Sequence, residues 1–209
     1  MHAHELGEQY ADFPQQDHTL KFGMWVFLAS EVLLFAALFA LYAAYRTMYV
    51  EDFRDAIEHN TLAYGTVNMF VLLCSSFTVA LSVWAVRRSR TGLAVFLQLT
   101  TMALGLAFLV IKLFEYAEHV RERALPGRYY HLVELPTFGA NRFFTMYWVM
   151  TGLHAVHVTG GVCLLGWLVY RTASRHYTPE HYTGLEMGTM YWHLVDIIWI
   201  FLWPLLYLA

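Results

Sequence analysis

Charged side chains are scarce in this sequence. Its 209 residues include 13 Lys and Arg and 16 Asp and Glu, so only 14% are charged, whereas 58% are hydrophobic. An average soluble domain is about one quarter charged, so this chain has too few charges to cover a globule that faces water on all sides. Its net charge of -3 gives no support for a nucleic-acid partner, because such a partner requires a basic face.

Cysteine is also rare. The two cysteines, Cys74 and Cys163, each lie inside an apolar run. Neither shows the spacing of a metal site, and a single pair carries little information about a disulfide. We therefore expect both to be small, buried hydrophobic residues.

The sequence contains long apolar runs in place of charged and cysteine residues. A helix rises about 1.5 Å per residue, so roughly 20 apolar residues cross a hydrocarbon layer of about 30 Å. Five runs reach that length, at about 22–45, 62–86, 92–114, 143–170 and 184–208. Backbone groups at that depth must bond within the segment, which favours helices over barrel strands. The expected fold is all-α: a polytopic membrane protein with a bundle of five transmembrane helices.

The segment of residues 1–20 is polar and lacks the basic start of a secretory signal. We expect it to lie in the cytoplasm, ahead of a transmembrane domain of residues 21–209. The numbers of Lys and Arg are equal on the two sides of the membrane. The positive charge is denser in short loops on the N-terminal side, as in the turn at residues 87–90, and this density favours a cytoplasmic N-terminus.

Glu31 is the ionisable residue of the first run. It lies about ten residues, or roughly 15 Å, into its helix, where a charged side chain must face protein or water. The small residues Ala36, Ala37 and Ala40 let another helix approach closely. Two interpretations remain open: a proton-related or conformational carboxyl, or a neutral acid that is hydrogen-bonded to a neighbouring helix.

His154 and His157 are three residues apart in the fourth run, so they share a helix face. Two imidazoles in this arrangement could bind a metal or a haem, or form hydrogen bonds between helices. Besides these two, His193 is the only histidine inside an apolar run. Three histidines are too few for a full redox core, so we favour the hydrogen-bonding interpretation.

His193 and Asp196 have the same spacing in the last run, so Asp196 could orient His193 or pair with it. Counted along their helices, these two residues reach a depth similar to those of Glu31, His154 and His157. The five residues could form one polar layer in the middle of the bundle. A structural network that fixes the helix register is the favoured role for such a layer, ahead of a chemical one.

Other candidates lie nearer the ends of the helices. Lys112 and Glu115 are expected to pair locally and to snorkel toward the membrane surface. Together with Glu186, Trp192 and Trp199 of the last run, Lys112 and Glu115 are candidates for packing or lipid contacts. No residue of the chain is expected to be catalytic or to bind a metal.

Four motifs resemble the family of cytochrome c oxidase subunit III, part of the haem-copper oxidases. Residues 23–35 (GMWVFLASEVLLF) resemble its helix with the pattern GM…SEVLFF, and residues 151–161 (TGLHAVHVTGG) resemble its TGxHxxHV helix. Residues 112–116 (KLFEY) are similar to its xxEY segment, and residues 186–207, which contain YWHLVD, to its last helix. The motifs occur in the order of the family, from about residue 21 to the end.

This resemblance implies an accessory, metal-free subunit of a proton-pumping terminal oxidase that reduces oxygen to water. In the family it packs against subunit I, which holds the haems and copper, and it accompanies subunit II. It protects subunit I from inactivation during turnover, supports proton uptake and holds lipids. Glu31 matches the family's carbodiimide-reactive membrane carboxyl. The implied setting is the inner membrane of a bacterium, with membrane lipids and a larger respiratory supercomplex as further partners and bound phospholipid as the one non-protein component.

The resemblance departs from the family in length. Many members have seven helices, and this chain lacks the first two, as five-helix bacterial forms do, so a lipid site between that pair and the rest is in doubt. Residues 30–31 and 191–193 are more similar to the cytochrome c branch than to quinol oxidases. Three alternatives stay open: a quinol oxidase subunit, a stand-alone transporter or proton channel that uses Glu31 and Asp196, and a small membrane cytochrome with haem on His154 or His157.

Overall fold

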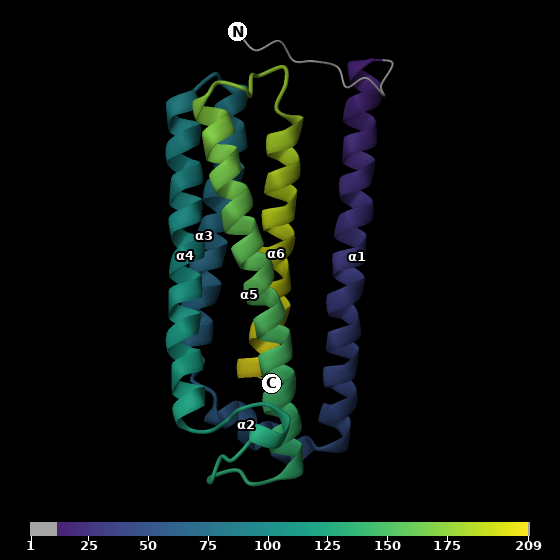
Figure 1. Cartoon of the computed structure of the whole chain (residues 1–209), viewed down its shortest axis with the longest axis vertical. Coiled ribbons are helices and arrows are strands. Elements are labelled where there is room, and N and C mark those ends of the chain that lie inside the picture. Colours follow the sequence, from purple (N-terminus) through teal and green to yellow (C-terminus); the bar gives the residue numbers. More distant parts are fainter. Residues whose placement is uncertain (1–11, 209) are drawn as a thin grey trace.

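Helices make up almost the whole of residues 12–208, the part of the chain that the structure, a computed structural model, describes. This part forms six α-helices and one 3-10 turn (Figure 1). In chain order they are α1 (Phe13–Met48), α2 (Val50–His59), α3 (Leu62–Arg87), α4 (Thr91–Arg121), η1 (Gly127–Tyr129), α5 (Phe138–Ala173) and α6 (Thr183–Tyr207). All of these α-helices except α2 are long and apolar enough to cross a membrane. The prediction of an all-α fold with five spans is confirmed.

The long helices extend beyond the apolar runs from which they were predicted. α1 begins at Phe13 rather than near residue 22, and the Asp12 carboxylate caps it by accepting a hydrogen bond from the Gln15 amide at 2.8 Å. Thr137 caps the start of α5 in the same way. Such caps satisfy free backbone N–H groups, so a helix can continue past the hydrocarbon layer. Residues 1–11 of the expected polar segment lie outside the described residues.

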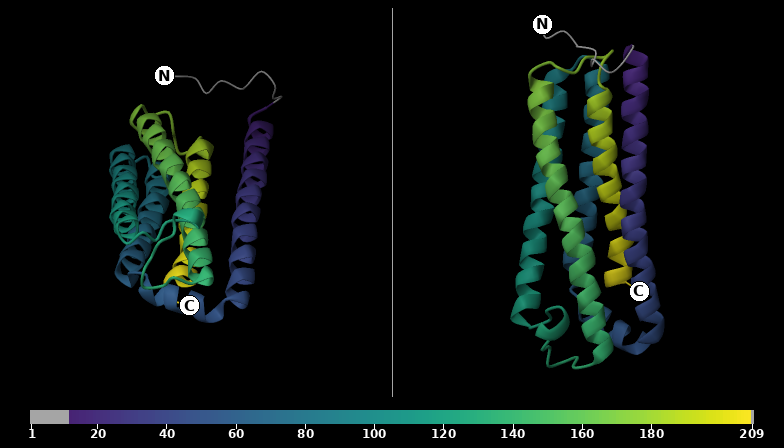
Figure 2. Two further views of the ribbon diagram at one scale, coloured as in Figure 1. Left: turned by 60° about the horizontal axis from the view of Figure 1, so that its bottom comes forward. Right: turned by 45° about the vertical axis from the view of Figure 1, so that its right-hand side comes forward.

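Helices α3, α4, α5 and α6 form a four-helix bundle, and α1 stands at its edge (Figures 1 and 2). Each bundle helix contacts the next in the order α3, α4, α5, α6, and α6 returns to α3. Within residues 12–208, α1 contacts α5 and α6 but neither α3 nor α4. In the most apolar stretch of α1 only 11% of the residues are buried, against 28–44% in the corresponding stretches of the other spans. α1 is therefore the most exposed of the five.

The two ends of the bundle carry different connections. The start of α1, the α3–α4 turn and the α5–α6 connection lie at one end, and α2 and residues 122–137 lie at the other (Figure 1). α2 is amphipathic: Phe53 and Ile57 are buried on its inner side. Its Asp52 carboxylate accepts a hydrogen bond from the Gly139 amide at 3.1 Å, which ties α2 to the first turn of α5.

Residues 122–137 are held by hydrogen bonds to the bundle and within the segment. The Trp148 indole of α5 donates to the Ala124 carbonyl oxygen at 2.8 Å, and the Tyr130 hydroxyl donates to the Leu135 carbonyl oxygen at 2.6 Å. Burial raises the pKa of Tyr130 to about 12, so this hydroxyl remains a donor at any physiological pH.

Trp192 of α6 locks the four bundle helices together. Its side chain is fully buried, and its indole N–H donates to the Ser75 hydroxyl of α3 at 3.0 Å. The ring fits only because two glycines face it. A Cβ atom added to Gly105 of α4 would lie 2.6 Å from the ring, and one added to Gly161 of α5 would lie 2.8 Å from it. Small residues at helix contacts are the usual means of close packing in membranes.

The expectation that both cysteines are buried is wrong. Cys74 of α3 and Cys163 of α5 are both exposed on the outside of the bundle. A transmembrane helix is apolar on its lipid-facing side as well as on its core-facing side. An apolar neighbourhood in the sequence therefore could not tell which side a cysteine occupies.

The glycine packing leads to a first prediction. We expect Gly161→Ala to destabilise the folded chain by about 1–3 kcal/mol, because the new methyl group overpacks against Trp192. Thermal unfolding in detergent would measure the change. Gly160→Ala is the matched control, since the nearest atom to its Cβ is the Tyr191 hydroxyl at 3.6 Å. Equal stabilities of the two variants would contradict the packing argument.

Candidate functional site: polar clusters inside the bundle

Glu31 of α1 contacts His157 of α5. Glu31 Oε2 and His157 Nε2 lie 2.8 Å apart, and the two side chains are 17% and 14% exposed. On the other side of the ring, His157 Nδ1 lies 2.8 Å from the Leu153 carbonyl oxygen. A carbonyl oxygen only accepts, so Nδ1 must carry the hydrogen. One proton is then shared between Nε2 and the carboxyl group, as imidazolium beside carboxylate or as imidazole beside carboxylic acid.

The Glu31–His157 pair has a net charge of zero in either form. Inserting it into the membrane therefore costs far less than inserting an unpaired charge, which would be strongly unfavourable. The Phe35 ring packs edge-on against His157 at 5.3 Å, and the Tyr191 hydroxyl donates to the His157 carbonyl oxygen at 3.1 Å. The arrangement can hold one proton where α1 meets α5 and α6.

His154 lies apart from this pair. It is fully buried, with its ring stacked on Trp199 at 5.2 Å and packed edge-on against Phe108 at 5.6 Å. Neither ring nitrogen has a hydrogen-bond partner among the described residues. The Phe35 ring lies 6.4 Å away on a further side. These rings fill the space that a haem would need, and His157 is committed to Glu31, so the two histidines do not fit haem ligation.

The expected direct pair of His193 and Asp196 is not present in the described part of the chain. The Ser76 hydroxyl of α3 lies 2.7 Å from His193 Nδ1, whereas neither oxygen of the Asp196 carboxyl has a hydrogen-bond partner among the described residues. Asp196 is only 2% exposed, and His193 is partly exposed. Two residues three apart on a helix point in directions that differ by about 60°, so His193 can contact a serine of the next helix while Asp196 stays buried.

The predicted single polar layer is therefore divided. Glu31 and His157 lie between α1 and α5, and His193 contacts Ser76 of α3. Asp196 is buried without a hydrogen-bond partner among the described residues, and His154 is packed among aromatic rings. In residues 12–208 no group of three or more His, Cys, Asp or Glu side chains is arranged to hold a metal ion.

A third cluster is the most enclosed. Lys112 and Glu115 of α4 are 1% and 0% exposed, and their charged groups lie 2.9 Å apart. Lys112 Nζ also donates to the hydroxyl oxygens of Tyr147 of α5 and Tyr207 of α6, each at 2.9 Å. Both tyrosine hydroxyls donate in turn to Glu115 Oε1, Tyr147 at 2.6 Å. We call these four residues the buried quartet.

The buried quartet corrects one prediction and supports another. Lys112 and Glu115 do pair, but they do not snorkel, because two tyrosines supply the polar partners that the membrane surface would have supplied. Every strong donor and acceptor of the ion pair is used, as burial of charges in a low-dielectric interior requires. The ring of Tyr207 reaches this position by packing against Gly65 of α3, where an added Cβ would lie 2.9 Å from the ring.

The remaining candidates are packing residues. Trp192 and Trp199 are fully buried, so neither faces lipid. Trp199 forms one wall of the quartet, with Lys112 Nζ 5.2 Å from its ring centroid. Glu186 lies near one end of α6 and accepts a hydrogen bond from the Arg87 guanidinium at 2.6 Å, which joins α6 to the α3–α4 turn.

Sequence reasoning missed Ser76, Tyr147 and Tyr207 as functional partners. Tyr207 lies close to the end of its span, where tyrosine is common at the membrane interface, so its position alone did not indicate a buried partner. A usable signal did exist for the quartet. A Lys–Glu pair inside an apolar run requires buried hydroxyl or amide partners, and only a few tyrosines lie at a matching depth.

These features define a class: a helical membrane protein with five spans in residues 12–208, whose buried Lys–Glu and Glu–His pairs connect neighbouring helices. The comparison with known families gives the particular one. The chain belongs to the family described as cytochrome c oxidase subunit III, which it matches over residues 11–209. It is therefore a subunit of a terminal oxidase complex of the respiratory chain, in which haem and copper reside in partner subunits.

The relatives divide between two kinds of oxidase. The chain is 32% identical to cytochrome c oxidase subunit 3 of Thermostichus vulcanus over 89% of this chain and 85% of that protein. It is 29% identical to quinol oxidase subunit 3 of Bacillus spizizenii, over 98% and 95% of the two chains. It is 27% identical to cytochrome bo(3) ubiquinol oxidase subunit 3 of Pseudomonas aeruginosa, over 99% and 92%.

The buried quartet yields a second prediction. Glu115→Leu would leave the Lys112 ammonium group buried without a counter-charge, and we expect a loss of about 3–5 kcal/mol in stability. The double variant Lys112→Met, Glu115→Leu should recover a large part of that loss, because it leaves no buried charge. Unfolding of the purified protein in detergent would measure both.

The control for this experiment is Glu58→Gln in α2. Its exposed ion pair with Arg54, at 3.3 Å, should contribute less than about 1 kcal/mol. If Glu115→Leu is no less stable than Glu58→Gln, or if the double variant is less stable than the single one, the quartet does not act as a charge-balanced unit.

Proposed function

We propose that this chain is subunit III of a haem-copper oxidase that takes electrons from cytochrome c, and that it stabilises subunit I and supports proton uptake. The observation that carries the proposal is the family match over residues 11–209, in a chain whose interior histidines do not fit a redox centre. Such a chain contributes to oxygen reduction through contact with its partners. The relative with the highest of the three identities above, 32%, carries the name cytochrome c oxidase subunit 3, which supports the choice of donor.

The Glu31–His157 pair supports the role in proton uptake. It holds one proton in the interior of the span, and both members are partly exposed, so the proton is not sealed inside the bundle. The Glu31 member of the pair lies on α1, the least buried span, where a neighbouring subunit could approach it. His154, His193 and Asp196 serve as packing and hydrogen-bonding residues in this proposal.

We further propose that the N-terminus faces the cytoplasm of a bacterium and that the complex lies in the plasma membrane, where it could join a larger respiratory assembly. The α3–α4 turn and the end of α5 lie at the end of the bundle where α1 begins (Figure 1). By their place in the sequence these segments carry the basic residues Arg87, Arg88, Arg90, Arg171 and Arg175. Positive charge of this density is typical of the cytoplasmic side. The relatives from Bacillus and Pseudomonas are bacterial proteins.

A quinol oxidase is the second candidate. The quinol relatives from Bacillus and Pseudomonas align with 98% and 99% of this chain, more than the 89% for the cytochrome c oxidase relative. A self-contained transporter is less consistent with the fold. Each of the five spans in residues 12–208 is one continuous helix, whereas transporters bind their solutes at broken helices.

A third prediction tests the accessory role. We expect Glu31→Gln to leave the complex assembled, with unchanged haem content, because the glutamine amide can still donate to His157 Nε2 and no redox ligand is lost. Turnover should fall by far less than the ~100-fold or more that follows loss of a catalytic proton-transfer group. Haem spectra and oxygen consumption of the purified complex would measure both. Loss of haem, or a fall of that size, would refute the accessory role.

A fourth prediction concerns the electron donor. The complex, purified through a tag on this chain, should consume oxygen rapidly with reduced cytochrome c and slowly with a short-chain quinol. Cyanide, which binds haem-copper centres, should abolish the activity and serves as the control for non-enzymatic oxidation. Rapid oxidation of quinol without oxidation of cytochrome c would establish the second candidate instead.

A further inference from the structure

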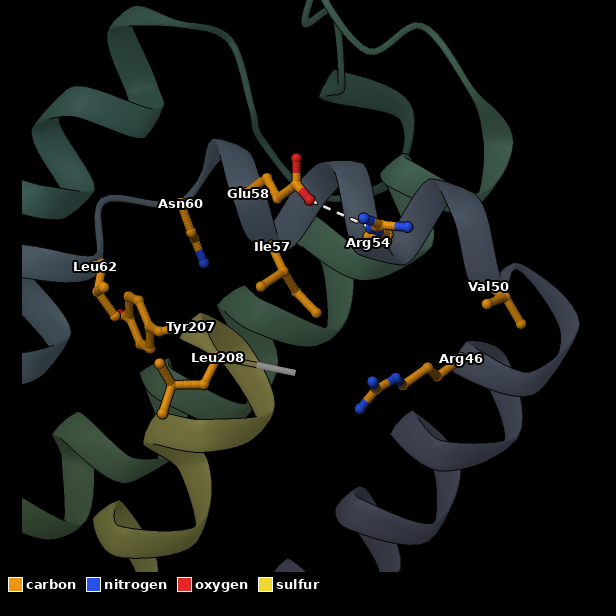
Figure 3. Close-up of a pocket in the computed structure, with 9 residues that line it drawn as sticks. All are labelled: Arg46, Val50, Arg54, Ile57, Glu58, Asn60, Leu62, Tyr207 and Leu208. Atoms are coloured by element: carbon orange, nitrogen blue, oxygen red, sulfur yellow. Dashed lines mark hydrogen bonds and ion pairs between the residues drawn. The ribbon is translucent and has the colours of Figure 1, made fainter.

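A cavity of about 460 Å³ lies where α1, α2 and α6 meet, at the end of the bundle that carries α2 (Figure 3). It is separate from the Glu31–His157 pair. Its walls combine two arginines with several apolar side chains, a composition that neither the helix packing nor the oxidase function described above requires.

Arg46 is the central group of this cavity. It belongs to the last turn of α1, and Figure 3 shows its side chain extending from α1 into the cavity, toward the end of α6. The residue is half-buried. No carboxylate of residues 12–208 pairs with it, and the Tyr42 hydroxyl lies within electrostatic range. A partly desolvated guanidinium without a counter-ion is unfavourable, so an anion in the cavity would stabilise it.

Arg54 of α2 also lines the cavity, and Figure 3 shows its side chain beside Glu58. It pairs with Glu58 at 3.3 Å, but both side chains are about two-thirds exposed, at 69% and 67%. An exposed pair of this kind is worth little, so Arg54 can turn toward a stronger anion at low cost. Two guanidinium groups against one carboxylate leave the lining with a net positive charge. The nearby acid Asp52 is occupied by the Gly139 amide.

The rim of the cavity is apolar. Val50, Leu62 and Leu208 line it and are nevertheless 58%, 46% and 53% exposed. All three lie next to ends of transmembrane helices, at the boundary between hydrocarbon and water. A small soluble anion has no use for such a rim. A phosphate attached to acyl chains would place its charge against the arginines and its chains against the rim and the apolar helix surfaces beside it.

We propose that this cavity binds the phosphodiester of an anionic glycerophospholipid, with Arg46 as the main contact and Arg54 as the second. Arginine matches phosphate because its planar fork of N–H groups can donate two parallel hydrogen bonds to phosphate oxygens. The Tyr207 ring lines the same cavity, and its hydroxyl belongs to the buried quartet. The bound lipid therefore packs against the helix end that the quartet holds.

The test uses the oxidase complex purified through a tag on this chain, stripped of loosely bound lipid and then titrated with phosphatidylglycerol in detergent. Native mass spectrometry counts the lipids retained. We expect Arg46→Gln to weaken the tightest retained site about tenfold, and Arg46→Lys to weaken it less, because the charge remains and only the forked geometry is lost. Arg128→Gln is the matched control: this exposed arginine lies over the Tyr129 ring, outside the cavity.

Two further arms distinguish the possible ligands. Phosphatidylcholine, which has the same phosphate but no net charge, should bind more weakly than phosphatidylglycerol, and inorganic phosphate should not compete. Equal retention in the wild-type complex and Arg46→Gln would overturn the proposal. So would full competition by inorganic phosphate, which would indicate a site for a soluble anion.

The inference rests on the proposed function only in requiring a membrane complex. If the tagged chain is purified without oxidase partners, the proposed function fails, and lipid retention by the chain and its Arg46→Gln variant still decides the lipid site.

Discussion

The charge pair of Lys112 and Glu115 is the constraint to which the rest of the bundle adjusts. Two opposite charges without access to water are tolerated only when their remaining hydrogen-bonding capacity is filled. Tyr147 from α5 and Tyr207 from α6 fill it, so three helices are fixed at one depth and one rotation. Apolar packing alone cannot do this in a membrane, because lipid tails solvate leucine as well as another helix does. The polar contacts therefore determine which of many similar helix packings is adopted.

The other polar clusters also connect helices through buried polar contacts, but each contains fewer residues. Glu31 and His157 share one proton and cancel each other's charge across α1 and α5, and the Ser76 hydroxyl of α3 lies 2.7 Å from His193 Nδ1 of α6. Each of these clusters joins two helices, and within residues 12–208 none forms a hydrogen-bonded line from one membrane face to the other. This distribution suits a subunit that holds its own helices in register beside a redox partner. A channel would need its polar groups in one connected file.

The sequence was sufficient to predict which segments span the membrane, but not which side chains of different helices contact one another. Run length and the scarcity of charge defined five helices, since the thickness of the hydrocarbon layer leaves little freedom. The depth of Glu31 followed from the same counting, but its partner did not. His154 and His157 share a helix face, and only the position of α1 made the second one the partner. The snorkelling expected of Lys112 failed for a similar reason, because tyrosines 35 and 95 residues away along the chain supply its contacts.

The carboxyl end of α6 is where these contacts converge. Helix ends leave backbone carbonyls without partners, and in α6 the Leu208 amide satisfies only the Pro204 carbonyl oxygen, at 3.2 Å. Tyr42 of α1 donates to the Leu205 carbonyl oxygen, and the Asn60 side-chain amide donates to that of Leu206 at 3.0 Å. The next residue, Tyr207, reaches Lys112 on one side and lines the arginine cavity on the other. A change in the cavity would therefore reach the Lys112–Glu115 ion pair through a single side chain, that of Tyr207. The Glu31–His157 pair is held by α1 and α5, so it would be affected only if α1 itself moved.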